Sequence, residues 1–290
     1  MSLNNSRIFV STIYFFLIII GVFINDLIPI NNPVYKLLAI DIALTMLIAI
    51  VGLLVKNDSI YDLYWSVIPF FMVIYWIDVS HIQAFNVRVF ILLALLGWWS
   101  WRLSYNWFRG WKGLSHEDWR YVDLRKKTKG FYPIVSFFGI QLFPTLIVFA
   151  AALPMQPIFY SEATLLYTDA LGGLLMLTGV LLEIFADRQM HIFRINPENT
   201  GKVINNGLWK YSRHPNYLGE ITFWWGLYIL SLATFPPLYF ITGPIIVTLL
   251  FVGISIPMME KRMKHRIGFE AYKRQTPILI PWNVFGKRKK

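Results

Sequence analysis

The sequence lacks cysteine and is poor in charge. Without a thiol the chain has no disulfide, no thiolate nucleophile and no zinc–thiolate site. Only 15% of the 290 residues are charged and 56% are hydrophobic, whereas about a quarter of the residues of a soluble domain are charged. The sequence also contains no G-x-G-x-x-G after a strand, no Walker loop, no H-E-x-x-H and no G-x-S-x-G. This composition predicts an all-α, polytopic bundle of transmembrane helices with cytoplasmic loops.

Apolar runs recur along the whole chain at about the length that crosses a bilayer, roughly 20 residues. Eight can be marked, at 8–24, 34–55, 61–79, 87–108, 131–153, 169–186, 219–235 and 238–256. Because no small-x-small cleavage site follows the first run, we expect a retained first span rather than a signal peptide. Only Pro236 and Pro237 separate the last two runs. Eight spans are expected, with seven spans and one interfacial segment as the alternative.

Basic residues concentrate in three segments and orient these spans. Residues 109–130, 187–218 and 257–290 hold 22 of the 27 Lys and Arg residues. Basic loops face the cytoplasm and anionic lipid, so eight spans place both termini there. The net charge of +11 therefore reflects the membrane, and no basic, polar module indicates nucleic-acid binding.

The stretch "GLWKYSRHPNYLGE" (207–220) is the most informative motif. Pro215 favours a helix start, and the free amides there, with Lys210 and Arg213, predict an anion site. An aromatic, basic membrane interface is the plainer interpretation. Glu220 favours a functional site, because a carboxylate inside an apolar run usually faces a cavity or a partner.

Three further segments carry polar groups. Glu183, Asp187 and His191 share one helix face at i, i+4 and i+8, but no second group of histidines completes a metal site, so none is expected. Arg102 and Asn106 share a face in "WWSWRLSYNWFRG" (98–110), which also fits an aromatic belt with a snorkelling arginine. Methionines at helical spacing in 257–282 predict an amphipathic interfacial helix.

The motifs "ADRQ", "GLWKYSRHPNYLGEITFWWG" and "EKR…Y" resemble the steroid 5-alpha-reductase and sterol reductase membrane family, in particular its bacterial branch of unassigned substrate. The resemblance covers about residues 60–282. It implies N-terminal transmembrane helices at 1–60 and a reductase-like membrane domain at 61–290, whose cofactor-binding half spans about 181–282. "RHPNYLG" and "GFEAYKRQTPILIP" are similar, more distantly, to isoprenylcysteine carboxyl methyltransferases and phospholipid N-methyltransferases.

The reductase resemblance implies NADPH bound at the cytoplasmic face and hydride transfer to an activated C=C bond of a steroid-like or other lipid. Arginines and aromatic rings suit the phosphates and the adenine of that cofactor. The implied cofactor-binding residues are Asp187, Arg188, Tyr211, Arg213, His214, Asn216, Tyr217, Arg262, His265 and Tyr272. The expected catalytic residues, in order, are Glu220, Asp62 and a lesser group, Tyr64, Tyr75 and Tyr105.

Two alternatives remain open at this point. An S-adenosylmethionine-dependent methyltransferase acting on a lipid or a prenylcysteine fits the second resemblance. A lipid-binding or transport protein without enzymatic activity fits the composition, but the chain shows no pair of similar halves, which many transporters have. Membrane lipids and a lipid-like small molecule are the expected partners.

Overall fold

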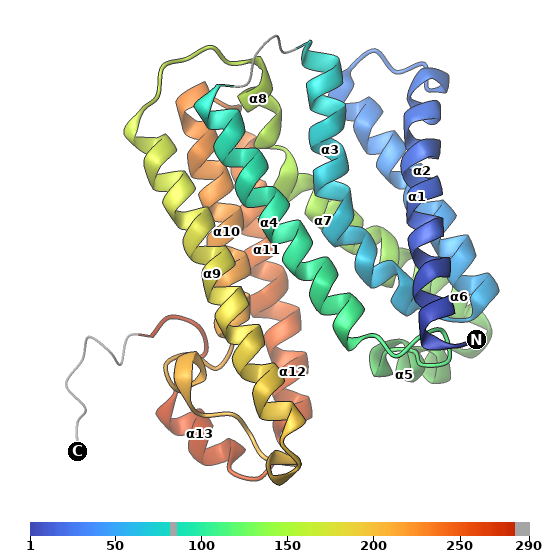
Figure 1. The fold of residues 1–290 in the computed structure, drawn as a ribbon, viewed down its shortest axis with the longest axis vertical. Helices are drawn as coiled ribbons and strands as arrows, with labels where there is room; N and C mark the ends of the chain where they lie inside the picture. Colours follow the sequence, from blue (N-terminus) through green and yellow to red (C-terminus); the bar gives the residue numbers. More distant parts are fainter. Residues whose placement is uncertain (82–85, 282–290) are drawn as a thin grey trace. The chain divides into compact units, whose positions relative to one another are not determined.

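The computed structural model describes residues 1–81 and 86–281, and these form two compact units, Met1–Tyr160 and Ser161 onward. Both units are helical, as expected (Figure 1). The α-helices of the first unit are α1 (Leu3–Leu27), α2 (Pro33–Val55), α3 (Tyr64–Ser80), α4 (Val87–Gly110), α5 (Trp119–Thr128), α6 (Tyr132–Ser136), α7 (Phe143–Ala152) and α8 (Met155–Tyr160). Those of the second are α9 (Tyr167–Ile195), α10 (Pro215–Ser231), α11 (Thr242–Leu250), α12 (Ile256–Met263) and α13 (Phe269–Gln275).

Seven helices in the described part of the chain are long and apolar enough to span a membrane. They cover Leu3–Leu27, Pro33–Val55, Asp58–Ser80, Val87–Gly110, Trp119–Tyr160, Tyr167–Ile195 and Leu238–Met263. The expected segment at 219–235 forms α10, which has 17 residues and is therefore about 26 Å long. It falls slightly short of the roughly 30 Å of a hydrocarbon core. The count is seven spans without α10 and eight spans with it.

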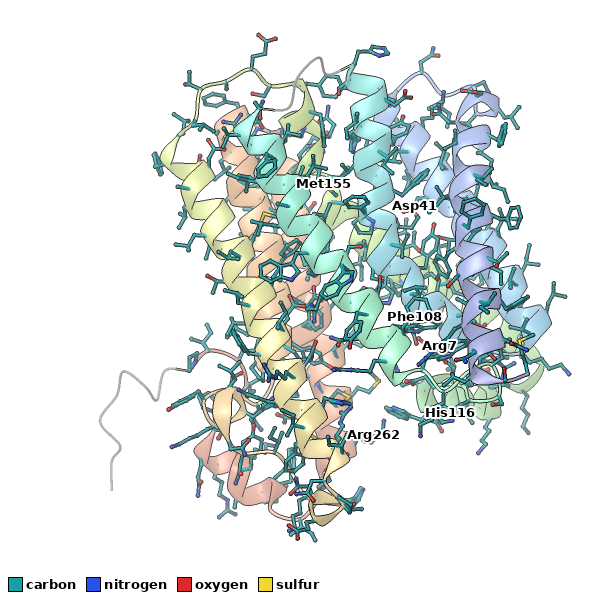
Figure 2. The ribbon with its side chains drawn as sticks, in the orientation of Figure 1. Arg7, Asp41, Phe108, His116, Met155 and Arg262 are labelled. Atoms are coloured by element: carbon teal, nitrogen blue, oxygen red, sulfur yellow. The ribbon has the colours of Figure 1, made fainter. Side chains whose placement is uncertain are left out.

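The N-terminal helix of the first unit is held by polar contacts to distant segments of that unit. Arg7 in α1 donates a 2.6 Å hydrogen bond to the carbonyl of Phe108 in α4, and both residues are labelled in Figure 2. Tyr14, also in α1, donates to the carbonyl of Ile60 at 2.8 Å. The first unit therefore includes the N-terminal helices up to Tyr160, and the boundary near residue 60 stays a prediction from the family resemblance.

Helices α9 and α10 run side by side (Figure 1), and their backbones approach each other closely at several glycines. A Cβ atom added at Gly172 would lie 2.3 Å from the backbone nitrogen of Leu230, and one at Gly179 would lie 2.7 Å from the carbonyl oxygen of Gly219. Gly226 faces the backbone of Gly172 in the same way. Small residues permit such close approach between helices in membranes, so these glycines hold the second unit together.

The expected amphipathic helix at 257–282 is divided in the structure. Its first part, α12, continues α11 through a π-helical segment, Phe251–Ser255, and belongs to the apolar helix Leu238–Met263. Its second part forms α13, which follows a turn at Gly268 with a φ of 83°. A π segment inserts an extra residue into a helix and is often found near functional sites.

Candidate functional site

The second unit contains a partly open cavity of about 460 Å³. Its size falls in the range of small-molecule and cofactor sites, roughly 300–1,000 Å³. The lining residues come from α9, the segment before α10, the start of α10, and α12 with the turn after it: Asp187, Met190, Arg194, Trp209, His214, Asn216, Tyr217, Met259, Arg262, Met263 and Arg266.

Three arginines dominate the charge of this cavity. Arg194 lies in the last turn of α9, Arg262 near the end of α12, and Arg266 in the turn that follows α12; Figure 2 labels Arg262. Both are close enough to Arg194 to repel it electrostatically, and Asp187 attracts it. The cavity therefore combines three guanidinium groups with one carboxylate, which is the chemistry of a site for a polyanion.

One wall of the cavity is aromatic. The ring of His214 stacks on Tyr217 with centroids 5.3 Å apart and an interplanar angle of 4°, and Tyr217 contacts Phe251 of the π segment at 4.8 Å. Burial, with the positive charge of Arg213 as the second cause, lowers the pKa of His214 to about 4. The imidazole is therefore neutral at pH 7 and presents a flat, uncharged ring to the cavity.

A buried polar layer supports this wall from behind. Tyr272 in α13 donates its hydroxyl to the carbonyls of Trp209 at 2.6 Å and Ser212 at 3.3 Å, and burial raises the pKa of that hydroxyl. The backbone amide of Arg213 donates to the carbonyl of Pro277 at 2.9 Å. The guanidinium of Arg213 pairs with Glu260 at 2.7 Å. These contacts fasten the segment before α10 to the C-terminal part of the chain.

The structure brings together five of the ten residues predicted to bind a cofactor. Those on the cavity wall are Asp187, His214, Asn216, Tyr217 and Arg262. Two others, Arg213 and Tyr272, lie behind the wall in the buried layer just described. The remaining three, Arg188, Tyr211 and His265, are exposed and are not among the residues that line the cavity.

None of the three predicted catalytic residues is among the residues that line this cavity. Glu220 is buried in α10, one turn beyond Asn216. Asp62, in the first unit, accepts a short hydrogen bond from Tyr121 and lies 3.9 Å from Arg120. Tyr105 is half exposed on α4 and stacks on Trp101. The catalytic roles of these three residues stay predictions.

Several lining residues were not predicted from the sequence. Arg194 lies seven residues after Asp187, two turns along the same face of α9, so helical spacing could have identified it. Arg266 is in a turn, where its guanidinium also donates to the carbonyl of Lys202 at 3.2 Å. No periodicity marks that position, because the turn is fixed by a contact across the chain.

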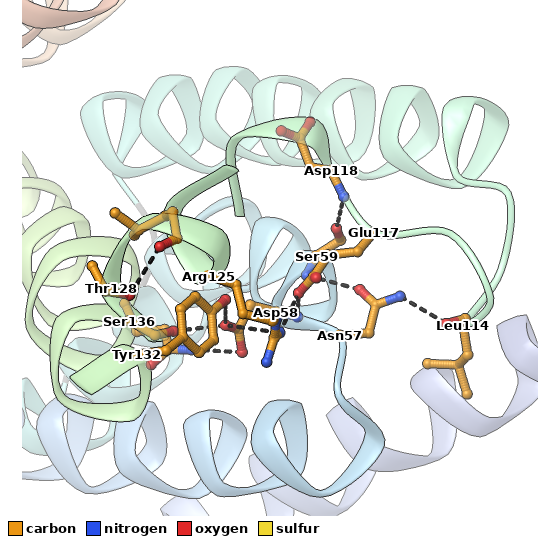
Figure 3. Close-up of polar contacts among 12 residues, drawn as sticks. Asn57, Asp58, Ser59, Leu114, Glu117, Asp118, Arg125, Thr128, Tyr132 and Ser136 are labelled. Carbon is orange, nitrogen blue, oxygen red and sulfur yellow. Dashed lines mark hydrogen bonds and ion pairs between the residues drawn. The ribbon is translucent and has the colours of Figure 1, made fainter. Parts of the chain in front are cut away.

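A second cluster of polar groups lies in the first unit, around Asp58 (Figure 3). The fully buried carboxylate accepts hydrogen bonds from Tyr132, from Ser136 at 2.7 Å and from Gln141 at 3.3 Å. Glu117 accepts from the amide of Asp58 at 2.9 Å and from Arg125 at 2.8 Å. Because the Asp58 carboxylate accepts from three neighbouring side chains and Glu117 is paired with Arg125, this cluster has the character of a structural junction.

No group of His, Asp and Glu residues in the described ranges is arranged to hold a metal ion. In particular, Glu183 is buried in α9 and Asp187 lines the cavity. Among the described residues, these two acids do not form a group of three metal ligands with another His, Asp or Glu. The site is therefore defined by arginines, aromatic rings and a single carboxylate.

Together, the spans and the cavity define a polytopic, all-α membrane protein with a basic, aromatic-walled cavity near its C-terminal end. The chain belongs to the family described as "Protein of unknown function (DUF1295)", whose model matches residues 48–276. This is a membrane family related to the steroid 5-alpha-reductases. The matched range includes every residue that lines the cavity.

Two curated relatives extend the comparison. An uncharacterized protein of Schizosaccharomyces pombe is 27% identical over 226 residues, which cover 69% of this chain and 65% of that protein. A methanethiol S-methyltransferase of Crocosphaera subtropica is 31% identical over 134 residues, 44% of this chain and 48% of the relative. The chain thus spans less than two thirds of the length of each. No solved structure matches it.

Proposed function

We propose that this protein is a membrane enzyme that binds NADPH in the cavity of its second unit and reduces an activated C=C bond of a steroid-like or other lipid. The observation that carries the proposal is the gathering of Arg194, Arg262 and Arg266 around one cavity with a single acid, Asp187. NADPH carries a pyrophosphate and a further phosphate, and guanidinium groups bind phosphates through charge-assisted, bidentate hydrogen bonds.

The other lining residues fit the remaining parts of this cofactor. Asp187 is an acceptor for a ribose hydroxyl, as acidic residues are in other nucleotide sites. His214, Tyr217 and Trp209 line the cavity with aromatic rings that can contact the adenine or the nicotinamide. When bound, the cofactor supplies the hydride, and the protein supplies orientation and polarisation.

Glu220 is the proposed acid for the substrate. Buried in an apolar helix, a carboxyl group can hydrogen-bond a carbonyl that is conjugated to the reducible bond, or protonate the neighbouring carbon. The three basic segments support a cytoplasmic location for the cavity, where NADPH is available.

An S-adenosylmethionine-dependent methyltransferase is the second candidate. It is favoured by the relative named methanethiol S-methyltransferase, which matches 44% of this chain. The charge of the cavity favours the reductase, because the methyl donor carries a sulfonium cation and three arginines repel cations.

A ligand comparison on the full-length protein in detergent tests the proposal. We expect NADPH to raise the unfolding temperature more than NADH, and S-adenosylmethionine to have little effect, since a ligand stabilises the state that binds it. NADPH oxidation with α,β-unsaturated ketone lipids then tests the reaction. Stabilisation by S-adenosylmethionine without stabilisation by NADPH would reverse the choice between the two candidates.

A further inference from the structure

A fourth arginine lies directly behind the cavity wall. Arg213 is buried, with 4% of its surface exposed, and it precedes His214, which lines the cavity. Its Nη1 is 2.7 Å from Oε1 of Glu260. The motif predicts an anion ligand for Arg213, but in the structure the arginine is paired with a carboxylate of its own chain.

Glu260 occupies a central position among basic groups. Besides Arg213, it lies 3.6 Å from Nε2 of His214 and 3.9 Å from Nζ of Lys273. In α12 it follows the lining residue Met259 and lies two positions before the lining residue Arg262. One carboxylate of α12, the helix that carries Arg262, therefore lies close to both the segment before α10 and α13.

We propose that Glu260 is a positioning residue of the cavity: by binding Arg213 it withholds a fourth guanidinium from the anionic ligand. This inference rests on the anion-binding cavity of the proposed function, and it does not depend on the reaction. A buried charge needs a partner. Glu260 and a phosphate group therefore compete for the same guanidinium.

The first experiment measures inorganic pyrophosphate binding to the full chain by calorimetry. Glu260→Gln keeps the size of the side chain and releases Arg213, so we expect pyrophosphate to bind about tenfold more tightly, the equivalent of one charge-assisted hydrogen bond, with a steeper dependence on salt. Glu270→Gln, an exposed acid in α13, is the matched control and should behave as wild type. Unchanged or weaker binding by the folded Glu260→Gln protein overturns the inference.

The second experiment uses the opposite charge deletion. Arg213→Gln leaves Glu260 without its main partner and 3.6 Å from the imidazole of His214, so a proton on His214 becomes favourable. The charged or titratable groups around this imidazole are Arg213, Glu260, Tyr217, Lys273 and Tyr272, together with the cavity residues Asp187, Arg194, Arg262 and Arg266.

Pyrophosphate binding by Arg213→Gln, relative to wild type at each pH, should therefore strengthen as pH falls from about 7 to 5, where histidine titrates. The double variant Arg213→Gln/Glu260→Gln removes both charges and should return both the pH profile and the affinity to those of wild type. A purely structural pair would alter stability without this new pH dependence.

The double variant also keeps the test decisive if Glu260→Gln does not fold, because it leaves no unpaired charge. If the double variant binds pyrophosphate much more weakly than wild type, Arg213 already takes part in binding the ligand. That result would refute the proposal that Glu260 withholds Arg213. If wild type binds neither pyrophosphate nor NADPH, the proposed function fails as well. If wild type binds both and only the variant pattern differs, the failure concerns Glu260 alone.

Discussion

The two units of this protein use polar residues in opposite ways. In the first unit, the acid Asp58 is enclosed by the hydroxyls of Tyr132 and Ser136, and its neighbour Glu117 is paired with Arg125 (Figure 3). In the second unit, Arg194, Arg262 and Arg266 converge on a cavity with one carboxylate among them. Buried groups that hydrogen-bond and ion-pair with one another stabilise a fold, whereas an excess of one sign around a cavity is typical of a ligand site.

The units also differ in how their helices pack. The second unit depends on glycines, which let the backbones of α9 and α10 touch. The first depends on hydrogen bonds between distant segments, such as Tyr61 with Gln141 and Thr145, at 2.7 and 2.8 Å. The candidate site is therefore built partly on this closely packed helix pair, which suits a site that must hold its side chains in place.

The largest effect is expected where the first unit loses its buried acid. Asp58→Ala removes the acceptor of three hydrogen bonds and the carboxylate that lies 4.0 Å from Arg125, and breaking such a buried pair costs about 3–5 kcal/mol. Thermal unfolding in detergent measures this loss. The control Asp123→Ala removes an exposed acid that pairs with Lys127 and should change stability by less than about 1 kcal/mol. Equal stability of both variants would contradict a structural role for Asp58.

A slightly smaller loss is expected at the helix pair of the second unit. In Gly172→Ala the new methyl group would lie 2.3 Å from the nitrogen and 2.6 Å from the Cα of Leu230. The two backbones must separate, at a cost of about 3 kcal/mol. Gly253→Ala is the matched control, since no atom outside the local helix lies within 4 Å of its Cβ position. If the two variants unfold at the same temperature, contact between the two backbones is not the basis of this packing.

The third prediction asks whether the geometry of the cavity or the sequence motif better identifies the residues that bind the cofactor. Arg262 lines the cavity, whereas Arg188, predicted from the same family resemblance, is exposed outside it. We expect Arg262→Gln to weaken NADPH binding by about 2 kcal/mol, the usual size of a hydrogen bond to a charged group, and Arg188→Gln to leave it unchanged. Calorimetric titration of both variants decides the matter. A larger loss in Arg188→Gln would favour the motif over the geometry.

The helical, membrane-spanning character of the chain could be predicted from composition and apolar run length, because both are local properties of the sequence. The cavity could be predicted only in part. Asp187 and Arg262 belong to recognisable motifs, but Arg266 reaches the cavity through a turn that pairs with Lys202. The burial of Arg213 against Glu260 likewise depends on a contact between residues 47 positions apart, which no periodicity reveals.

The smallest expected effect concerns pH. Because burial lowers the pKa of His214 to about 4, below its value of about 6.5 in an unfolded chain, the unfolded state binds more protons between these two values. The stability contributed by the neutral imidazole is therefore present above pH 6.5 and is lost as pH falls toward 4, by about 1 kcal/mol between pH 7 and 5.5. His214→Phe keeps a ring against Tyr217 and should lose less stability over that interval. Parallel pH profiles for the two proteins would mean that His214 titrates normally, and that the wall of the cavity is more open to water than its 3% exposure indicates.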